Sequence, residues 1–311
     1  MIISQTDPSM VFALVLSCAL AAVAVAGESV ADEGGGATWA STEHGDLLIT
    51  AMEHAPFPHP SRAEGYTRRD TFYPADEHYG DASVAVFIPE GYAPGADGAV
   101  DVLFYFHGHG NHVRQTLGEI PLLEVVAKAT RPRVLVFPQG PYVAPDSSGG
   151  RLEEAGEAEA LVDEVLGYVG ARLGREVVPG RVTLSGHSGA YRVITQILAH
   201  GAMGGRVDEV LLLDATYGGL GALADWATEA PGEGSAERRL RSVFTAHLAD
   251  ENTWLMAELR SRGQAFLLTR NDLLDGDDAA VEPASGAACL FVHTDESHNA
   301  AREWLGRWLA E

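Results

Sequence analysis

Short apolar runs recur along the chain from about residue 66 onward, and Gly, Pro, Asp or His ends most of them. Most of these runs are apolar at every position rather than at alternate positions. That pattern is typical of strands that are buried on both faces, as in a parallel sheet covered by helices. Strands are therefore predicted at residues 83–89, 100–106, 133–137, 181–185, 209–213, 242–246 and 289–293.

Helical patterns separate these runs. Apolar side chains recur every three or four positions in residues 158–173, and Gly174 follows as a stop signal. The same spacing recurs near the C-terminus at Trp304, Leu305, Trp308 and Leu309. The alternation of strands and helices predicts an α/β fold with a mostly parallel central sheet flanked by helices on both faces. In such sheets the functional residues lie beyond the carboxyl ends of the strands.

The chain begins with a different pattern. Residues 1–26 contain a long apolar run that ends in Ala24-Val25-Ala26, and small residues at these positions indicate cleavage of a signal peptide after Ala26. The run has about 16 residues, which is short for a permanent membrane-spanning helix. Export to the periplasm or the medium is therefore expected, without stable membrane insertion after cleavage. A lipid anchor on Cys18 is the weaker alternative.

The remaining chain divides into two parts. Residues 27–65 are rich in Gly, Glu and Pro and weakly patterned, so an irregular lead-in segment is expected there. Residues 66–311 carry the strand and helix rhythm and are expected to form one α/β domain. The segment 217–240, which follows a predicted strand, is too short for a separate cap domain.

Charge and cysteine content exclude several functions. The net charge of −23 argues against a nucleic acid or an anionic membrane surface as a partner, because both repel an acidic protein. Cleavage after Ala26 leaves Cys289 as the sole cysteine, so no intrachain disulfide is expected. The sequence has no nucleotide-binding glycine fingerprint, and no cofactor is expected. It does not indicate an oligomeric state.

A candidate nucleophile lies at the end of the predicted strand 181–185. There the sequence GHSGA (186–190) leads directly into a helical pattern, so Ser188 is placed at a tight turn between strand and helix. Such a turn lifts a serine hydroxyl out of the sheet, and small flanking residues let strand and helix approach closely. The N–H of Gly189, at the start of the helix, is suited to stabilise an oxyanion. The alternative is that Ser188 only caps the helix.

A nucleophilic serine needs a base, and the base needs a carboxylate to orient it. His298 follows the last predicted strand and opens the last helix, which makes it the candidate base; the alternative is a surface histidine that caps the helix. Two aspartates follow strands that lie between Ser188 and His298. Asp214 comes directly after 209–213 and is favoured. Asp250 follows 242–246 less directly, and it is also placed to cap a helix.

The order of these features resembles the α/β-hydrolase superfamily, in particular its serine esterases and lipases, from about residue 66 onward. The resemblance rests on FHGHGN (106–111), GHSGA (186–190), an Asp after the next strand and a His before the final helix. It implies an α/β-hydrolase fold without a large cap domain, and hydrolysis of a small or polymeric carboxylic ester through an acyl-enzyme. It also implies an oxyanion hole from the Gly108–His109 segment and Gly189.

The sequence departs from that superfamily at two positions. Ala190 stands where glycine is more usual, and a methyl group there is normally tolerated. Many members also carry the acid one strand later than Asp214, which keeps Asp250 open as the alternative acid.

Other functions stay open beside this one. A serine peptidase or amidase would use the same residues, and an inactive scaffold of this fold would only bind a ligand. HGHGNH (107–112) also resembles the H-x-H-x-D-H motif of metallo-β-lactamase-like enzymes, in which His107, His109 and His112 would bind zinc with His187 and Asp214. Asn111 replaces the aspartate of that motif, and an amide is neither an anionic ligand nor a base. No metal is therefore expected.

Overall fold

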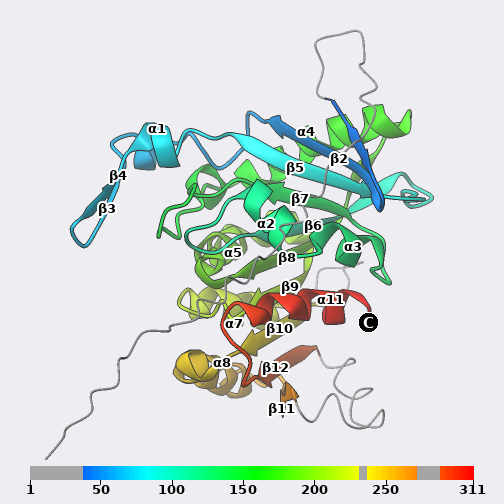
Figure 1. The fold of residues 1–311 in the computed structure, drawn as a ribbon. Coiled ribbons are helices and arrows are strands. Elements are labelled where there is room, and N and C mark those ends of the chain that lie inside the picture. The colour runs from blue at the N-terminus through cyan, green and yellow to red at the C-terminus, as the bar shows by residue number, and fades with distance from the viewer. Residues whose placement is uncertain (1–37, 231–236, 272–287) are drawn as a thin grey trace, which may run out of the picture.

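A computed structural model describes residues 38–230, 237–271 and 288–311 (Figure 1). The predicted signal peptide (1–26) and Cys18 lie outside the described residues. Ten strands form one sheet in the order β1-β2-β5-β7-β6-β8-β9-β10-β12-β11. Their bounds are β1 (Ala40–Thr42), β2 (Gly45–Ala51), β5 (Ser83–Pro89), β6 (Ala99–Phe106), β7 (Val134–Pro138), β8 (Val178–His187), β9 (Val207–Leu213), β10 (Arg239–Phe244), β11 (Leu267–Arg270) and β12 (Cys289–His293).

All strand pairs from β7 to β11 along this order are parallel, whereas β1, β2 and β5 pair in antiparallel fashion with their neighbours. Because parallel strands share a direction, the carboxyl ends of β6, β8, β9, β10 and β12 lie along one edge of the sheet. A separate hairpin, β3 (Tyr66–Arg68) with β4 (Thr71–Tyr73), extends away from the sheet together with the short helix α1 (Ala75–His78) (Figure 1).

Helices cover both faces of the sheet. One face packs against α4 (Glu157–Leu173), α5 (Tyr191–Ala199), α6 (Ala202–Gly205), α7 (Leu220–Thr228) and α8 (Ala249–Ser261). The other face packs against α2 (Val113–Glu119), α3 (Leu122–Ala127) and α11 (Trp304–Leu309). Within a strand the side chains alternate between the two cores, as Val86 and Phe87 do in β5. Burial on both faces explains why the central strands are mostly apolar at consecutive positions.

The structure confirms the expected α/β-hydrolase architecture, a mostly parallel sheet between two helical layers. All predicted strands are present, and β5 and β12 have the predicted bounds. The described part of 217–240 holds α7 and the start of β10, so the described residues contain no large cap domain. They also contain no helix that is both long and apolar enough to span a membrane.

The expectation of an irregular lead-in over 27–65 does not hold for its described part. Residues 40–51 contain β1 and β2, and β2 pairs along its whole length with β5. The physical reason is exposure: β2 (GDLLITA) is only partly buried, with Leu48 as its one buried residue, so it lacks a continuous apolar run. Residues 38–65 therefore contribute two strands to the same sheet as the expected domain.

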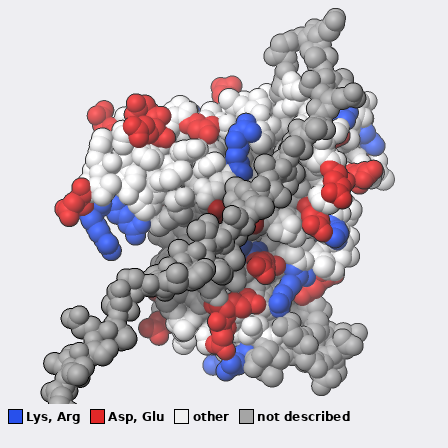
Figure 2. Space-filling model, viewed as in Figure 1, with Lys and Arg blue, Asp and Glu red and all other residues white. Residues whose placement is uncertain are grey.

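Charge on the visible surface agrees with an acidic protein. On the face shown in Figure 2, Lys and Arg side chains lie beside Asp and Glu, and no continuous basic surface forms among the described residues there. This face thus gives no support for nucleic-acid binding.

Candidate active site

Ser188 lies at a strained turn at the carboxyl edge of the sheet. β8 ends at His187, a single turn of 3-10 helix spans Ser188–Ala190, and α5 follows directly. Ser188 has a φ of 54°, a left-handed conformation that costs a non-glycine residue about 1–3 kcal/mol. A Cβ on Gly186 would lie 2.5 Å from the Cβ of Ala190, so only glycine permits this close approach of strand and helix. The turn matches the strand-turn-helix setting of a nucleophilic serine.

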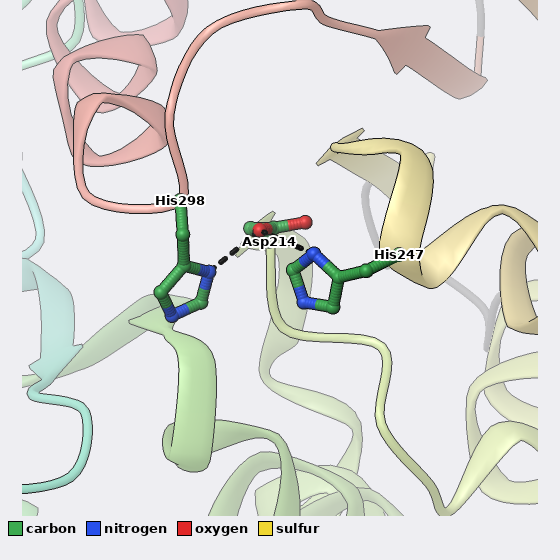
Figure 3. Close-up of side chains that lie close together, drawn as sticks. All are labelled: Asp214, His247 and His298. Atoms are coloured by element: carbon green, nitrogen blue, oxygen red, sulfur yellow. Dashed lines mark hydrogen bonds and ion pairs between the residues drawn. The ribbon is translucent and has the colours of Figure 1, made fainter.

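Asp214 directly follows β9 and is completely buried. Its Oδ2 accepts a hydrogen bond of 2.6 Å from Nδ1 of His298, and its Oδ1 accepts one of 2.8 Å from the N–H of Thr245 (Figure 3). Burial by itself would raise the pKa of Asp214, but the hydrogen bonds from His298 and Thr245 outweigh it and lower the pKa. The carboxylate therefore stays ionised. A proton on Nδ1 of His298 leaves Nε2 with a free lone pair.

The second candidate acid lies elsewhere. Asp250 is exposed in the first turn of α8, where a carboxylate interacts favourably with the helix dipole. Among the described residues His298 is bonded to Asp214 and not to Asp250. Asp250 does not cap the helix either, because the N-cap position is Leu248 and no side chain makes a capping hydrogen bond there.

His187 holds His298 next to the serine turn. Its Nε2 donates a hydrogen bond of 2.9 Å to the carbonyl oxygen of His298, and the two imidazole rings lie 4.5 Å apart. Burial and the neighbouring charge of His298 lower the pKa of His187 to about 3, so its ring is neutral. Because Ser188 is the next residue, this contact brings the imidazole of His298 alongside the turn.

Tyr217 completes the surroundings of Ser188. The hydrogen bonds of the described residues do not include one between Ser188 and His298; the Ser188 side chain instead contacts the Tyr217 hydroxyl. Burial raises the pKa of Tyr217 while this contact with Ser188 lowers it, and the net shift is upward. Tyr217 is therefore a neutral phenol. In enzymes, hydrogen bonds between a nucleophile and its base are often absent or long before substrate binds, so the lack of a bond from Ser188 to His298 does not exclude that pairing.

The loop after β6 packs directly against the serine turn. A Cβ on Gly108 would lie 3.0 Å from the Cβ of Ser188, and a Cβ on Gly189 would lie 2.4 Å from Cδ2 of His109. Nε2 of His109 is fixed by a hydrogen bond of 2.7 Å to Oγ of Ser147. The structure thus brings together Gly108, His109 and Gly189, the three residues predicted for an oxyanion hole. Backbone N–H groups at such a junction suit a developing negative charge.

Alanine in place of Gly189 is expected to lower kcat by about 10²- to 10³-fold, because the new methyl group would displace the His109 ring and the loop that carries the His109 N–H. Steady-state kinetics on a chromogenic ester measures this loss. Gly167→Ala is the matched control, since a Cβ there in α4 meets nothing within 4 Å. Equal kcat values for the two variants would contradict the predicted oxyanion hole.

The three histidines of FHGHGNH do not converge on one point. His107 has a pKa that burial lowers to about 4, and its Nε2 accepts a hydrogen bond of 3.1 Å from the Gly140 N–H. His112 caps α2, where it accepts a hydrogen bond from the Gln115 N–H. Together with the bond from His109 to Ser147, these contacts give each ring a separate structural partner. The described residues hold no metal-ligand cluster at this loop.

A second group of possible metal ligands, which the sequence does not predict, lies around Asp214. Asp214, His247 and His298 offer ligand atoms that all lie within 4.8 Å of one another (Figure 3). His247 comes from the short 3-10 turn Ala246–Leu248 after β10, and its side chain is 47% exposed. One sequence feature could have pointed to His247: it directly follows the predicted strand 242–246, three residues before Asp250.

No protein-family model matches the chain, and no curated protein matches it. Solved structures do resemble it. A feruloyl esterase module from Clostridium thermocellum complexed with sinapinate is 12% identical over 73% of this chain and 82% of its own, with a TM-score of 0.46. An S-formylglutathione hydrolase from Staphylococcus aureus is 11% identical over 87% of this chain and 99% of its own, with a TM-score of 0.45. A ferulic acid esterase from the fungus Anaeromyces mucronatus is 14% identical over 90% of this chain and 91% of its own, with a TM-score of 0.42.

Proposed function

We propose that this protein is a serine hydrolase that cleaves a carboxylic ester through an acyl-enzyme. The observation that carries the proposal is the 2.6 Å hydrogen bond from His298 to the buried carboxylate of Asp214, next to a serine held at a φ of 54°. A nucleophile, a base and an orienting acid from three different strand ends are the parts that acyl transfer needs.

In the first step Oγ of Ser188 attacks the ester carbonyl carbon while Nε2 of His298 takes its proton. Asp214 accepts a hydrogen bond from Nδ1 and stabilises the imidazolium that forms. The N–H groups of His109 and Gly189 bind the carbonyl oxygen as it becomes negative. The alkoxide leaves with the proton from His298. Water then attacks the acyl-enzyme by the same route and frees Ser188.

An ester is the proposed substrate because its carbonyl is more reactive than that of an amide. The site also suits a small or polymeric ester, since no large cap domain covers it among the described residues. The side chain of His298 is 35% exposed, which leaves the base accessible from solvent. Each step uses only side chains and backbone groups of this chain, so the proposed reaction needs no cofactor.

A pre-steady-state experiment tests this function. Rapid mixing with p-nitrophenyl acetate is expected to give a burst of p-nitrophenol of about one equivalent per enzyme, because acylation releases the alcohol before water clears the acyl group. The matching p-nitroanilide serves as the comparison. Faster turnover of the anilide would favour a peptidase or amidase, and the absence of turnover on both would favour a binding scaffold.

Export is part of the same proposal. It is supported by the apolar run that ends in Ala24-Val25-Ala26, and acylation of Cys18 is its weaker alternative. Extracellular or periplasmic esters, polymeric or small, would then be the available substrates.

A further inference from the structure

The proposed mechanism leaves one histidine at the site without a role. His247 lies on the other side of the Asp214 carboxylate from His298 (Figure 3), with its Nδ1 3.8 Å from Oδ2 of Asp214. The two imidazole rings are 5.4 Å apart. The buried carboxylate of Asp214 therefore lies close to two histidines, whereas the proposed mechanism uses only His298.

The donor set of Asp214, His247 and His298 fits a divalent first-row transition ion. Two imidazole nitrogens and one carboxylate oxygen are the ligands that Zn²⁺ takes in open sites with three protein ligands. Ligand atoms around tetrahedral zinc lie about 3.3 Å apart, given bonds of about 2.0 Å to each atom. The present separations of 2.6 Å from His298 and 3.8 Å from His247 to Oδ2 of Asp214 bracket that value. The third separation, between the ligand nitrogens of the two histidines, is at most 4.8 Å, so shifts of up to about 1.5 Å would seat the ion.

Access and orientation also suit a metal ion. The side chains of His247 and His298 are 47% and 35% exposed, so solvent can supply the ion and the remaining ligand. The Tyr217 hydroxyl lies 2.7 Å from Nε2 of His247, which directs Nδ1 of that ring toward Asp214. Hydrogen bonds of this kind orient metal ligands from outside the coordination shell.

Two contacts must be broken when the ion binds, and one of them is the hydrogen bond between His298 and Asp214. Nδ1 of His247 now lies 2.6 Å from Oγ1 of Thr245. Thr245 does not lose its partner in the exchange, because the same hydroxyl bonds Oδ2 of Asp214 at 3.0 Å. The cost of opening the site is thus confined to the His247 contact and the His298–Asp214 hydrogen bond.

We propose that Asp214, His247 and His298 form an inhibitory site for Zn²⁺ or a similar ion. The inference rests on the proposed function for its consequence and on the ligand geometry for the site itself. A metal on Nδ1 of His298 takes the lone pair of that atom and leaves the imidazole proton on Nε2. Nε2–H cannot accept the proton of Ser188, and Asp214 no longer orients the ring. Binding moves protons between ring nitrogens without any redox change, and removal of the ion restores the base.

The test compares zinc inhibition of the full-length wild-type protein with that of His247→Gln, in buffer without chelator. We expect Zn²⁺ to inhibit the wild type reversibly, EDTA to restore activity, and Mg²⁺, which prefers oxygen ligands, to have no effect. His247→Gln is expected to keep most of its ester hydrolysis and to need at least about tenfold more Zn²⁺ for half inhibition. His200→Gln, which changes an exposed histidine at the end of α5, is the matched control and should respond like the wild type.

Calorimetric titration of Ser188→Ala with Zn²⁺ separates this inference from the proposed function, because the variant retains all three ligands whatever its activity. We expect one ion per chain, and at least about tenfold weaker binding after His247→Gln is added. Equal zinc affinity with and without His247, or no binding to Ser188→Ala, would overturn the inhibitory site. If Ser188→Ala instead hydrolysed the ester as fast as the wild type, the proposed function would be overturned.

Discussion

Alanine at position 188 is expected to lower kcat for ester hydrolysis by about 10⁵- to 10⁶-fold with little change in KM. The substitution removes the oxygen that forms the acyl-enzyme, and the remaining members of a triad contribute almost nothing without it. The residual rate would come from the backbone N–H groups of the oxyanion hole and from binding. Stopped assays with high enzyme concentration, on the same ester as the wild type, measure the loss.

The control for Ser188→Ala is Ser261→Ala, which removes an exposed hydroxyl at the end of α8 and should leave kcat unchanged. Thermal unfolding should shift little for either variant, because alanine in the left-handed turn bears the same strain as serine. Near-wild-type hydrolysis by Ser188→Ala, together with its loss on chelation, would support the zinc alternative built on His107, His109 and His112.

Asparagine in place of Asp214 is expected to lower kcat by about 10⁴-fold. An amide cannot stabilise the imidazolium of His298, and its NH₂ group favours the wrong tautomer of the ring. Backbone strain does not explain such a loss, since Asp214 has a φ of 51° and asparagine tolerates this conformation well. The amide oxygen can also still accept the Thr245 N–H. The pH-rate profile and kcat of the purified variant check the expectation.

Asp250→Asn is the matched control for Asp214→Asn. Its carboxylate is exposed in the first turn of α8, so kcat should change by less than about twofold, and the free energy of unfolding should fall by about 0.3–1 kcal/mol through the helix dipole. A reversed pattern, in which Asp250→Asn loses the activity, would assign the acid to Asp250 and leave Asp214 as a structural residue.

The central sheet was predictable because burial on both faces leaves a mark in the sequence. β5, β7 and β12 are buried at nearly every position, so each is a continuous apolar run. β2 and β11 were missed for the opposite reason. They are partly exposed, at or near the edges of the sheet, where polar residues interrupt the pattern. The prediction of an irregular lead-in was therefore wrong for residues 40–51, because partly exposed strands lack the continuous apolar run by which the other strands were recognised.

Strand ends also located most of the candidate site. Ser188, Asp214 and His298 were expected together because each follows a strand of one parallel sheet, and Asp214 and His298 prove to be hydrogen-bonded. The sequence left Asp250 open because it does not reveal the 3-10 turn Ala246–Leu248, which continues directly into α8 and carries Asp250 into that helix. That same turn presents His247 to the site. Its partners Asp214 and Tyr217 are distant in sequence, so only the folded chain reveals the contact.

Labelling with a fluorophosphonate probe tests the central claim most directly, because the reagent reacts with an activated serine and leaves a stable adduct. Intact mass and peptide mapping are expected to show one adduct per wild-type chain, on Ser188. Labelling should be absent in Ser188→Ala and strongly slowed in Asp214→Asn. An adduct that persists at the same stoichiometry in Ser188→Ala would contradict the assignment of Ser188 as the nucleophile.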